Sequence, residues 1–248
     1  MIIAHDLKKA FGSNQVLNGV DLHVQTGESV VIIGRSGGGK SILLKHLIGL
    51  IRPDAGEVFI DNQPIQAMNE RQLLLVRRKF GMLFQSAALF DSLTVAENIS
   101  FVLRRERQLT PGEIAQKVDE ALSMVELENV QTKKPAELSG GMRKRVGLAR
   151  AIIYQPEIVL YDEPTTGLDP VVADSIDHLI LRVCERLKVT TVVVTHDMRS
   201  ARRIGQRILM LHQGRIHAAG PADEIFNSSD PVVRQFVNGI SDPKQIDF

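Results

Sequence analysis

The feature that most constrains the fold is a glycine-rich loop, GRSGGGKS at residues 34–41, set between two apolar segments. The segment before it, SVVIIG, is rich in β-branched side chains and predicts a strand buried on both faces. The segment after it, SILLKHLIGL, has apolar residues at helical spacing. Strand, loop and helix in this order are the context in which G-x-x-x-x-G-K-[ST] indicates a phosphate-binding loop. The alternative, a flexible glycine-rich turn, does not account for the flanking elements.

The residue types in this loop suit the phosphates of a nucleotide. Glycines let backbone N–H groups approach phosphate oxygens, and the dipole of the following helix favours negative charge. We expect Lys40 to reach the β- and γ-phosphates and the Ser41 hydroxyl to ligate Mg²⁺. The sequence therefore predicts nucleotide binding.

The rest of the chain predicts an α/β fold with a parallel sheet. Residues 1–27 alternate apolar and polar positions, which is typical of antiparallel strands with one wet face, and RPDAGEVFIDNQP predicts a turn and a hairpin strand. Residues from about 70 to 151 have helical periodicity. EIVLYDEP and TTVVVTHD predict apolar strands separated by a helix over 171–187, and RILMLHQGRIHAAG predicts a strand pair around a Gln-Gly turn. The more polar C-terminal stretch SSDPVVRQFVNGISDPKQIDF, from residue 228, predicts one short helix at most. Apolar strands alternating with helices favour an α/β core.

Composition excludes several classes of protein. The chain has 248 residues and a net charge of +1, so charge gives no case for nucleic-acid binding. The single cysteine, Cys184, excludes an internal disulfide framework and fits a reducing compartment. We expect no secretory signal, and no apolar run approaches the ~18–20 residues that cross a bilayer. The chain is therefore not expected to span a membrane by itself.

Four further polar residues follow apolar segments and are candidates for chemistry on the nucleotide. IVLYDEP places Asp162 and Glu163 at the end of a buried strand. They are either solvated loop charges or, beside a phosphate loop, a Mg²⁺ partner (Asp162) and the group that orients or deprotonates the attacking water (Glu163). His196, at the carboxyl end of TTVVVT, is either a structural histidine or a γ-phosphate contact. Gln85 is either a surface glutamine or a ligand for Mg²⁺ or water.

A second stretch, ELSGGMRKRVGLARA, has two interpretations of equal weight. Ser139 could cap a helix over 142–153, with Gly140 and Gly141 as loop residues. The paired glycines, which cost helix stability, instead favour a second phosphate-binding helix start. The basic residues that follow are interpreted as a solvated helix face, with RNA contact as the alternative; they are Arg143, Lys144, Arg145 and Arg150.

With these residues assembled, the chain resembles the nucleotide-binding subunits of ATP-binding cassette (ABC) transporters over residues 1 to about 222. GRSGGGKS is similar to the Walker A loop, IVLYDEP to Walker B, LSGGM to the signature and GLDP to the D-loop, while Gln85 matches the Q-loop and His196 the switch histidine. The resemblance implies a single ABC ATPase domain over 1–248. It implies a P-loop NTPase core with a mostly parallel sheet, an N-terminal antiparallel β subdomain, an inserted helical subdomain at about 86–155 and a tail from about 223.

The resemblance also assigns ATP and Mg²⁺ as ligands, with Phe11 where the family has an adenine-stacking aromatic. The catalytic assignments are Lys40, Gln85, Glu163 and His196, and the metal assignments are Ser41, Gln85 and Asp162. The expected nucleotide contacts are Phe11, Val16, Arg35, Ser36, Gly37, Gly38, Gly39, Lys40, Ser41, Ile42, Ser139, Gly140 and Gly141.

In this family two cassettes form a head-to-tail dimer, and each ATP lies between the phosphate loop of one copy and the signature helix of the other. The resemblance thus implies that Ser139, Gly140 and Gly141 serve the partner's γ-phosphate. Two positions depart from the family pattern: Met142, where the signature usually ends in Gln, and Ile42, where a second hydroxyl is common. Neither removes a catalytic group, so we expect competent sites.

Three stretches, LFQSAALFDSLTVAENI, LSGGMRKR and DPVVRQFVNGI, resemble ATPases of Mla/Mce-type lipid-transport systems. The resulting prediction is an ATP-hydrolysing subunit on the cytoplasmic face of the inner membrane. Its expected partners are a second copy, a membrane permease and a lipid-binding periplasmic protein, with no nucleic acid. The apolar residues 87–93 either pack in the core or line a groove for a permease helix.

Three alternatives stay open. The first is an importer-type ABC system for another small substrate. The second is a non-transport ABC ATPase that acts on nucleic acid or ribosomes through the basic stretch after the signature. The third, a phosphoryl transferase, ranks last because it leaves the signature unexplained.

Overall fold

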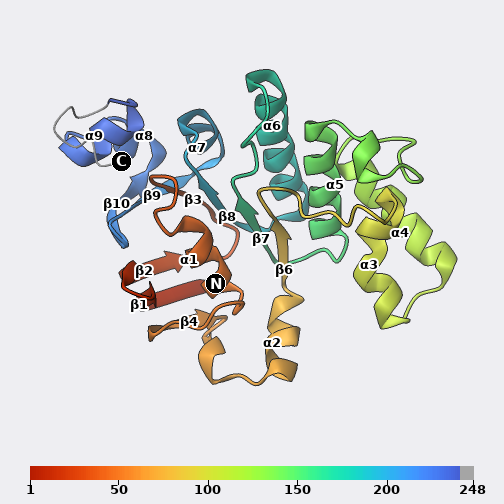
Figure 1. Cartoon of the computed structure of the whole chain (residues 1–248), viewed down its shortest axis with the longest axis horizontal. Helices are drawn as coiled ribbons and strands as arrows, with labels where there is room; N and C mark the ends of the chain where they lie inside the picture. The colour runs from red at the N-terminus through yellow and green to blue at the C-terminus, as the bar shows by residue number, and fades with distance from the viewer. Residues whose placement is uncertain (241–248) are drawn as a thin grey trace. The chain divides into compact units, whose positions relative to one another are not determined.

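The computed structural model describes residues 1–240, which divide into two compact units (Figure 1). Unit 1 combines Met1–Leu73 with the described residues from Val192 onward, and unit 2 is Leu74–Thr191. The boundaries fall within helix α2 (Glu70–Arg77) and strand β8 (Thr190–Thr195). The tail predicted from about 223 is described as far as residue 240, and its last eight residues lie outside the described part.

The antiparallel sheet of unit 1 has the order β2-β1-β4-β5. Its strands are β1 (Ile2–Phe11), β2 (Asn14–Val24), β4 (Ala55–Ile60) and β5 (Gln63–Pro64). Strand β1 pairs antiparallel with both β2 and β4. Alternation buries Ile2 and Ala4 while His5 stays exposed, which is the pattern of a sheet with one wet face. The predicted antiparallel N-terminal subdomain is confirmed.

The other strands of unit 1 position the glycine-rich loop. Strand β3 (Ser29–Ile33) pairs parallel with β9 (Arg207–His212), which pairs antiparallel with β10 (Arg215–Pro221). Residues 30–33 are completely buried, as a strand covered on both faces requires. The helices of this unit are α1 (Lys40–Leu47), α7 (Met198–Ile204), α8 (Ala222–Phe226) and α9 (Pro231–Val237), with the 3₁₀ turn Ile65–Ala67. In the C-terminal stretch from Ser228, the described residues form one short helix, α9, as expected.

Unit 2 contains a parallel strand pair and most of the helices. Its strands are β6 (Phe80–Leu83) and β7 (Ile158–Asp162). Its helices are α3 (Val95–Glu106), α4 (Pro111–Met124), α5 (Gly140–Ile152) and α6 (Pro170–Leu187), with the 3₁₀ turn Pro135–Glu137. In Figure 1, α3, α4 and α5 lie together in yellow and green. Helix α5 packs against β6 and against α3, α4 and α6, so it is enclosed on several sides.

Two expectations for unit 2 are wrong in detail. The predicted helical periodicity over about 70–151 is interrupted by β6, a four-residue strand too short to impose its own period on the pattern. Helix α5 begins at Gly140 rather than 142, because the Ser139 hydroxyl accepts a hydrogen bond from Met142 N and ends the loop there.

Polar caps fix the starts of the remaining long helices in unit 2. Thr94 and Glu97 form a capping box on α3, and Thr110 and Glu113 form another on α4. Asp169 accepts hydrogen bonds from the first amides of α6. Among residues 1–240, no helix combines the length and hydropathy needed to cross a bilayer.

Candidate nucleotide site

The loop at residues 34–41 has the backbone that close approach to an anion requires. Gly39, which precedes α1, has a φ of 95° that few other residues adopt. A Cβ on Gly34 would lie 2.4 Å from the carbonyl oxygen of Leu211, so a larger residue would displace the loop from the end of β9. The loop therefore needs glycine both for conformation and for space.

Lys40, the first residue of α1, is 5% exposed, and its ammonium donates to the carbonyls of Gly34 (2.9 Å) and Arg35 (3.0 Å). A buried cation thus lies within the loop, and the first amides of a helix point outward without intrahelical acceptors. Ser41 follows in the first turn and is partly exposed. This donor set suits the phosphates of ATP.

The other predicted nucleotide contacts in unit 1 are placed as follows. Val16 lies against the loop, since its Cγ1 would be 3.0 Å from a Cβ on Gly39. Phe11 ends β1 and is 48% exposed, with the Lys9 ammonium 5.5 Å from the ring centre. An exposed ring of this kind is able to receive a flat base. The exposed loop positions are Arg35, Ser36 and Gly37, while Gly38 and Ile42 are partly exposed.

His196 follows directly after β8 and is exposed. Asp197 next to it caps α7, and its amide donates to the Thr195 hydroxyl at 2.9 Å. These contacts fix the backbone on one side of the histidine. Its predicted role at the γ-phosphate stays a prediction.

In unit 2 the register of the parallel pair brings three predicted residues to one edge. Leu83 of β6 is the partner of Tyr161 of β7, so Gln85 and Glu163 each come two residues after paired positions. Parallel strands place their carboxyl ends at the same edge, where ligands of α/β folds bind. Asp162 and Glu163 are 6% and 7% exposed, and Gln85 is exposed.

Glu163 has an unusual backbone, with a φ of 48°. A non-glycine residue in the left-handed region costs roughly 1–2 kcal/mol, and such strain is found preferentially at functional sites. Its Oε2 accepts a hydrogen bond from the Thr166 hydroxyl at 3.1 Å. The carboxylate is therefore oriented by a neighbour three residues further along the chain.

The signature stretch has a local explanation in the structure. Ser139 caps α5, and Gly140 and Gly141 lie inside the helix rather than in a loop. A Cβ on Gly141 would lie 2.6 Å from Val172 Cγ1, and one on Gly140 would lie 3.1 Å from Leu168 Cδ2. Packing against the start of α6 therefore accounts for the paired glycines. Their service to a partner's phosphate stays a prediction.

The interpretation of the basic stretch as a solvated face is wrong for Lys144. This residue is 5% exposed, and its ammonium donates to the carbonyls of Gln85 (2.5 Å) and Glu163 (3.1 Å). Burial lowers the pKa of Lys144 to about 8, although the nearby Glu163 and Asp162 carboxylates oppose this. Helical spacing could have revealed it, since Lys144 lies three residues after the buried Gly141 and four before Leu148.

The remaining cations of this stretch also bind protein atoms. Arg150 donates to the carbonyls of Ala88 and Ala87, both at 2.7 Å. Arg145 donates to the Val125 carbonyl and the Glu126 carboxylate, and Arg143 donates to the Leu138 carbonyl. Sequence reasoning missed these roles because a charge does not reveal whether it contacts water or a carbonyl.

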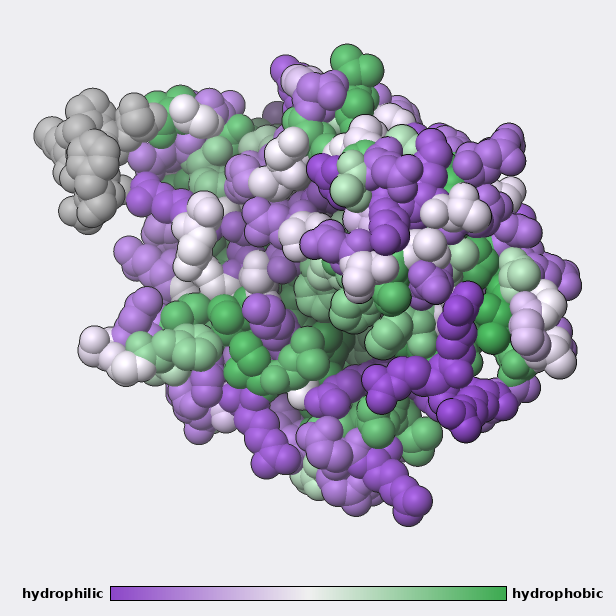
Figure 2. Space-filling view, turned by 45° about the vertical axis from the view of Figure 1, so that its right-hand side comes forward, coloured by the Kyte–Doolittle hydropathy of each residue, from purple (hydrophilic) through white to green (hydrophobic). Residues whose placement is uncertain are grey.

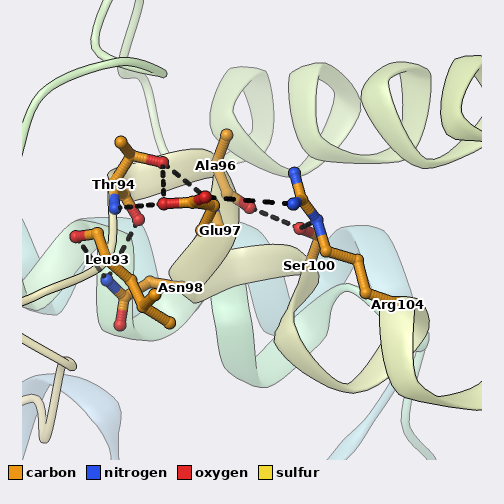
Figure 3. A network of polar contacts seen from close by, with 7 residues as sticks. All are labelled: Leu93, Thr94, Ala96, Glu97, Asn98, Ser100 and Arg104. Carbon is orange, nitrogen blue, oxygen red and sulfur yellow. Dashed lines mark hydrogen bonds and ion pairs between the residues drawn. The ribbon is translucent and has the colours of Figure 1, made fainter.

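The end of the segment that follows Gln85 is held by α3. The Asn98 amide donates to the carbonyls of Leu93 and Thr94, and also to that of Phe90, whose N–H it accepts at 2.7 Å. Figure 3 shows this amide beside Leu93 and Thr94, with the Glu97 carboxylate between Thr94 and Arg104. Asn98 is completely buried. One side chain thus closes the turn over residues 90–94.

A cavity of about 670 Å³ opens beside the same segment. Its apolar lining includes Phe84, Ala88, Phe90, Phe101 and Val102. The predicted stretch 87–93 therefore divides between two environments, because Ala87 is buried at 1% exposure whereas Phe90 is 46% exposed. The charged residues of the lining are Arg77, Arg78, Arg150 and Glu106, and Glu106 pairs with Arg78 at 2.6 Å.

A protein-family model described as "ABC transporter" matches residues 17–166, more than half of the chain. The chain belongs to the ABC transporter family. This confirms the family resemblance, and with it the prediction of an ATPase at the level of the family.

Individual relatives agree with the family assignment. The chain is 41% identical over 238 residues to the probable ribonucleotide transport ATP-binding protein mkl of Mycobacterium tuberculosis, covering 96% of this chain and 66% of that protein. It thus spans slightly less than two thirds of that relative. It is 39% identical over 258 residues to the chloroplastic protein TRIGALACTOSYLDIACYLGLYCEROL 3 of Arabidopsis thaliana, covering 98% of this chain and 74% of that protein.

A solved structure supports the fold. The dimeric post-hydrolysis structure of the ATP-binding cassette MJ0796, bound to ADP and Pi, matches with a TM-score of 0.82 and 35% identity. The match covers 90% of this chain and 99% of that one. The predicted α/β fold with a parallel-rich sheet and an antiparallel N-terminal sheet is confirmed.

Proposed function

We propose that this chain binds ATP with Mg²⁺ and hydrolyses it as the energy-providing subunit of an ABC transporter whose substrate is phospholipid or another lipid. The observation that carries the proposal is the loop at 34–41, where a buried Lys40 lies among glycines at the start of α1. A family member solved with ADP and Pi has the same fold. The chain would act at the cytoplasmic face of the inner membrane as a peripheral subunit.

The candidate site residues would have different roles in phosphoryl transfer. The loop amides and Lys40 would hold the phosphates, which is the positioning on which this reaction depends. Ser41, Gln85 and Asp162 offer the hydroxyl, amide and carboxylate oxygens that Mg²⁺ prefers. When bound, Mg²⁺ neutralises charge that develops on the phosphates. Glu163 would orient the attacking water and accept its proton at a carboxylate oxygen, and His196 would contact the γ-phosphate.

A permease helix is the occupant that best fits the cavity beside residues 84–90. The cavity has aromatic and aliphatic walls, which suit the apolar face of an amphipathic helix. Of the charged residues in its lining, Arg78 pairs with Glu106, and Arg150 donates to the carbonyls of Ala87 and Ala88. Figure 2 shows hydrophobic residues bordered by hydrophilic ones on the face it presents. Exposed Leu74 and Val102 also line the cavity.

One relative, the Arabidopsis protein, and the three local stretches given above support lipid as the substrate. The name of the Arabidopsis relative refers to a galactolipid, whereas that of the mycobacterial relative refers to ribonucleotide transport. Transport of another small substrate is therefore the second candidate. Action on RNA is disfavoured, because Arg143, Lys144, Arg145 and Arg150 already donate to protein atoms.

Hydrolysis is tested with the purified chain. Glu163→Gln should retain ATP binding and lose turnover, because the amide cannot accept the proton, whereas Lys40→Ala should lose binding as well. Wild-type turnover by Glu163→Gln would remove the assignment of Glu163 as the base.

Transport is tested in the cells that carry this chain. An integral membrane protein should co-purify with the wild type, and Val102→Asp in the cavity wall should abolish this. Leu75→Asp is the control, since Leu75 is 63% exposed and is not among the lining residues. Vesicles containing the complex should move labelled phospholipid when ATP is added. If ATP drives the movement of ribonucleotide but not of phospholipid, the lipid proposal is wrong and transport of another small substrate takes its place.

A further inference from the structure

Two cations of α5 hold the backbone on both sides of the proposed catalytic edge. Lys144 binds the carbonyl of Gln85, which follows β6, and the carbonyl of Glu163, which follows β7. Arg150, six residues along the same helix, binds the carbonyls of Ala87 and Ala88. Hydrogen bonds from a charged donor are roughly twice as strong as neutral ones, and burial strengthens them further.

Three of the four carbonyls that these cations bind belong to strained backbone. Glu163, Ala87 and Ala88 have φ values of 48°, 60° and 46°, a region that non-glycine residues rarely occupy. Such conformations persist only where the surroundings determine them strongly. Charged donors from α5 stabilise these conformations, because each of the three carbonyls accepts a hydrogen bond from Lys144 or Arg150.

We propose that Lys144 is a positioning residue for ATP hydrolysis, which joins the backbone of Gln85 to that of Glu163 and so sets the direction of both side chains. This inference rests on the roles proposed above for Gln85 and Glu163. Fixing the carbonyl of a residue fixes its peptide plane and narrows the directions open to its Cα–Cβ bond. A single ammonium that holds both carbonyls also sets their separation.

The expected signature is a loss of kcat with little change in KM. Lys144 bonds to the residues assigned to the attacking water and the metal, whereas phosphate binding is assigned to the loop at 34–41. Misplacing a reacting group by about 1 Å costs on the order of 100-fold in rate. Nucleotide affinity, which reports ground-state binding, should change by less than about threefold.

The test uses steady-state ATP hydrolysis by the purified full chain. Lys144→Met keeps the apolar stem but removes both donors, and its kcat should fall roughly 10- to 100-fold. Lys144→Arg, which retains charge and donors, should recover at least part of that loss. Lys117→Met, which alters a partly exposed lysine of α4 in the same unit, is the control and should match the wild type.

A combined variant tests whether Lys144 acts through Gln85. If it does, Lys144→Met should cost less in a Gln85→Ala background than in the wild type, since the side chain that it positions is already absent. Equal costs in both backgrounds would contradict the proposal. So would a folded Lys144→Met variant with wild-type kcat, or a kcat that falls only in proportion to the folded fraction measured by circular dichroism.

Two further measurements distinguish a failure of this inference from a failure of the proposed function. If Lys144→Met does not fold, Lys144→Gln takes its place with the same expectation, because the shorter amide reaches at most one of the two carbonyls. Glu163→Gln is assayed alongside. An inactive Glu163→Gln with a fully active Lys144→Met overturns this inference alone, whereas an active Glu163→Gln overturns the proposed function on which it rests.

Discussion

Asn98 shows how much one buried amide can determine. Its oxygen accepts from Phe90 N–H, and its nitrogen serves the carbonyls of Phe90, Leu93 and Thr94. Because Phe90 lines the cavity assigned to the permease, the geometry of that wall depends on Asn98. These hydrogen bonds join the first turn of α3 to the segment just before it.

We expect Asn98→Asp and Asn98→Ala to be about equally destabilising, by roughly 2–3 kcal/mol each. The aspartate has the same shape but cannot donate, so it leaves the carbonyls unpaired and adds repulsion. Urea unfolding measures the effect. Gln116→Ala, which removes one exposed hydrogen bond to Glu120, should change the free energy of unfolding by less than about 0.5 kcal/mol. A stable Asn98→Asp variant would show that the amide donors matter little.

For single residues, the sequence predicts a role when the interacting partners are close to the residue in the chain. Lys40 and Ser41 are predictable because the glycines and the flanking strand and helix are adjacent in sequence. Lys144 is not, because its acceptors lie 59 and 19 residues away. The same holds for Gly141, whose reason is the space occupied by Val172.

At the scale of elements, β6 depends on a close approach to α5. A Cβ on Gly81 would lie 2.3 Å from the carbonyl oxygen of Ala151, near the end of that helix. Backbone has little freedom to move away from such a contact. Gly81 therefore allows the strand and the helix to pack, and this helix carries the cations that reach residues 85–88.

We expect Gly81→Ala to lower the free energy of unfolding by about 2–3 kcal/mol, because the added methyl forces the backbone of β6 and α5 apart. Gly112→Ala is the matched control, since Gly112 lies in α4 with nothing within 4 Å of an added Cβ. It should be neutral or stabilising by up to about 1 kcal/mol. Equal effects of the two changes, measured by urea unfolding, would argue against a packing role for Gly81.

The elements predicted from sequence are those with a strong pattern of their own. Strands β3 and β8 are rich in β-branched residues, and β7 begins with an apolar run. Strands β9 and β10 flank the Gln213–Gly214 turn, where both residues have positive φ. Strand β6 has only four residues and a glycine. Pairing with β7, rather than local preference, makes it a strand, and a sequence pattern does not record that pairing.

Across the whole molecule, carboxylates with lowered pKa values make stability sensitive to acid. Hydrogen bonds from Thr94 lower the pKa of Glu97, and those from Thr110 lower the pKa of Glu113, both below the ordinary value of 4.5. A lowered pKa contributes stability that is present above the unfolded value and is lost as the pH falls through the folded value.

We therefore expect the free energy of unfolding to decrease between about pH 5 and pH 3. The double variant Glu97→Gln/Glu113→Gln keeps acceptors in both capping boxes but does not titrate there. Its stability should decline less steeply over the same range in urea unfolding. Identical slopes for the variant and the wild type would remove the capping carboxylates as a cause.

The assembly is also tested at this scale. If each site combines the loop of one copy with the signature of the other, Ser139→Arg and Lys40→Ala should each be inactive alone and recover activity when mixed. The mixed dimer would have one interface with both defects and one with neither. Sites contained within one chain predict no recovery. Circular dichroism of Ser139→Arg checks that loss of the cap, which costs about 1 kcal/mol, has not unfolded α5.

The contacts of α5 also limit how this protein can be recombined with its relatives. A chimaera that took α5 from a cassette with an apolar residue at position 144 would leave the carbonyls of Gln85 and Glu163 without their shared donor. Exchanging only residues 85–88 would replace the backbone whose carbonyls Arg150 binds, and the new carbonyls need not lie within its reach. Helix α5, residues 85–88 and the turn at Glu163 would therefore have to be exchanged together in a chimaera, although they are far apart in the sequence.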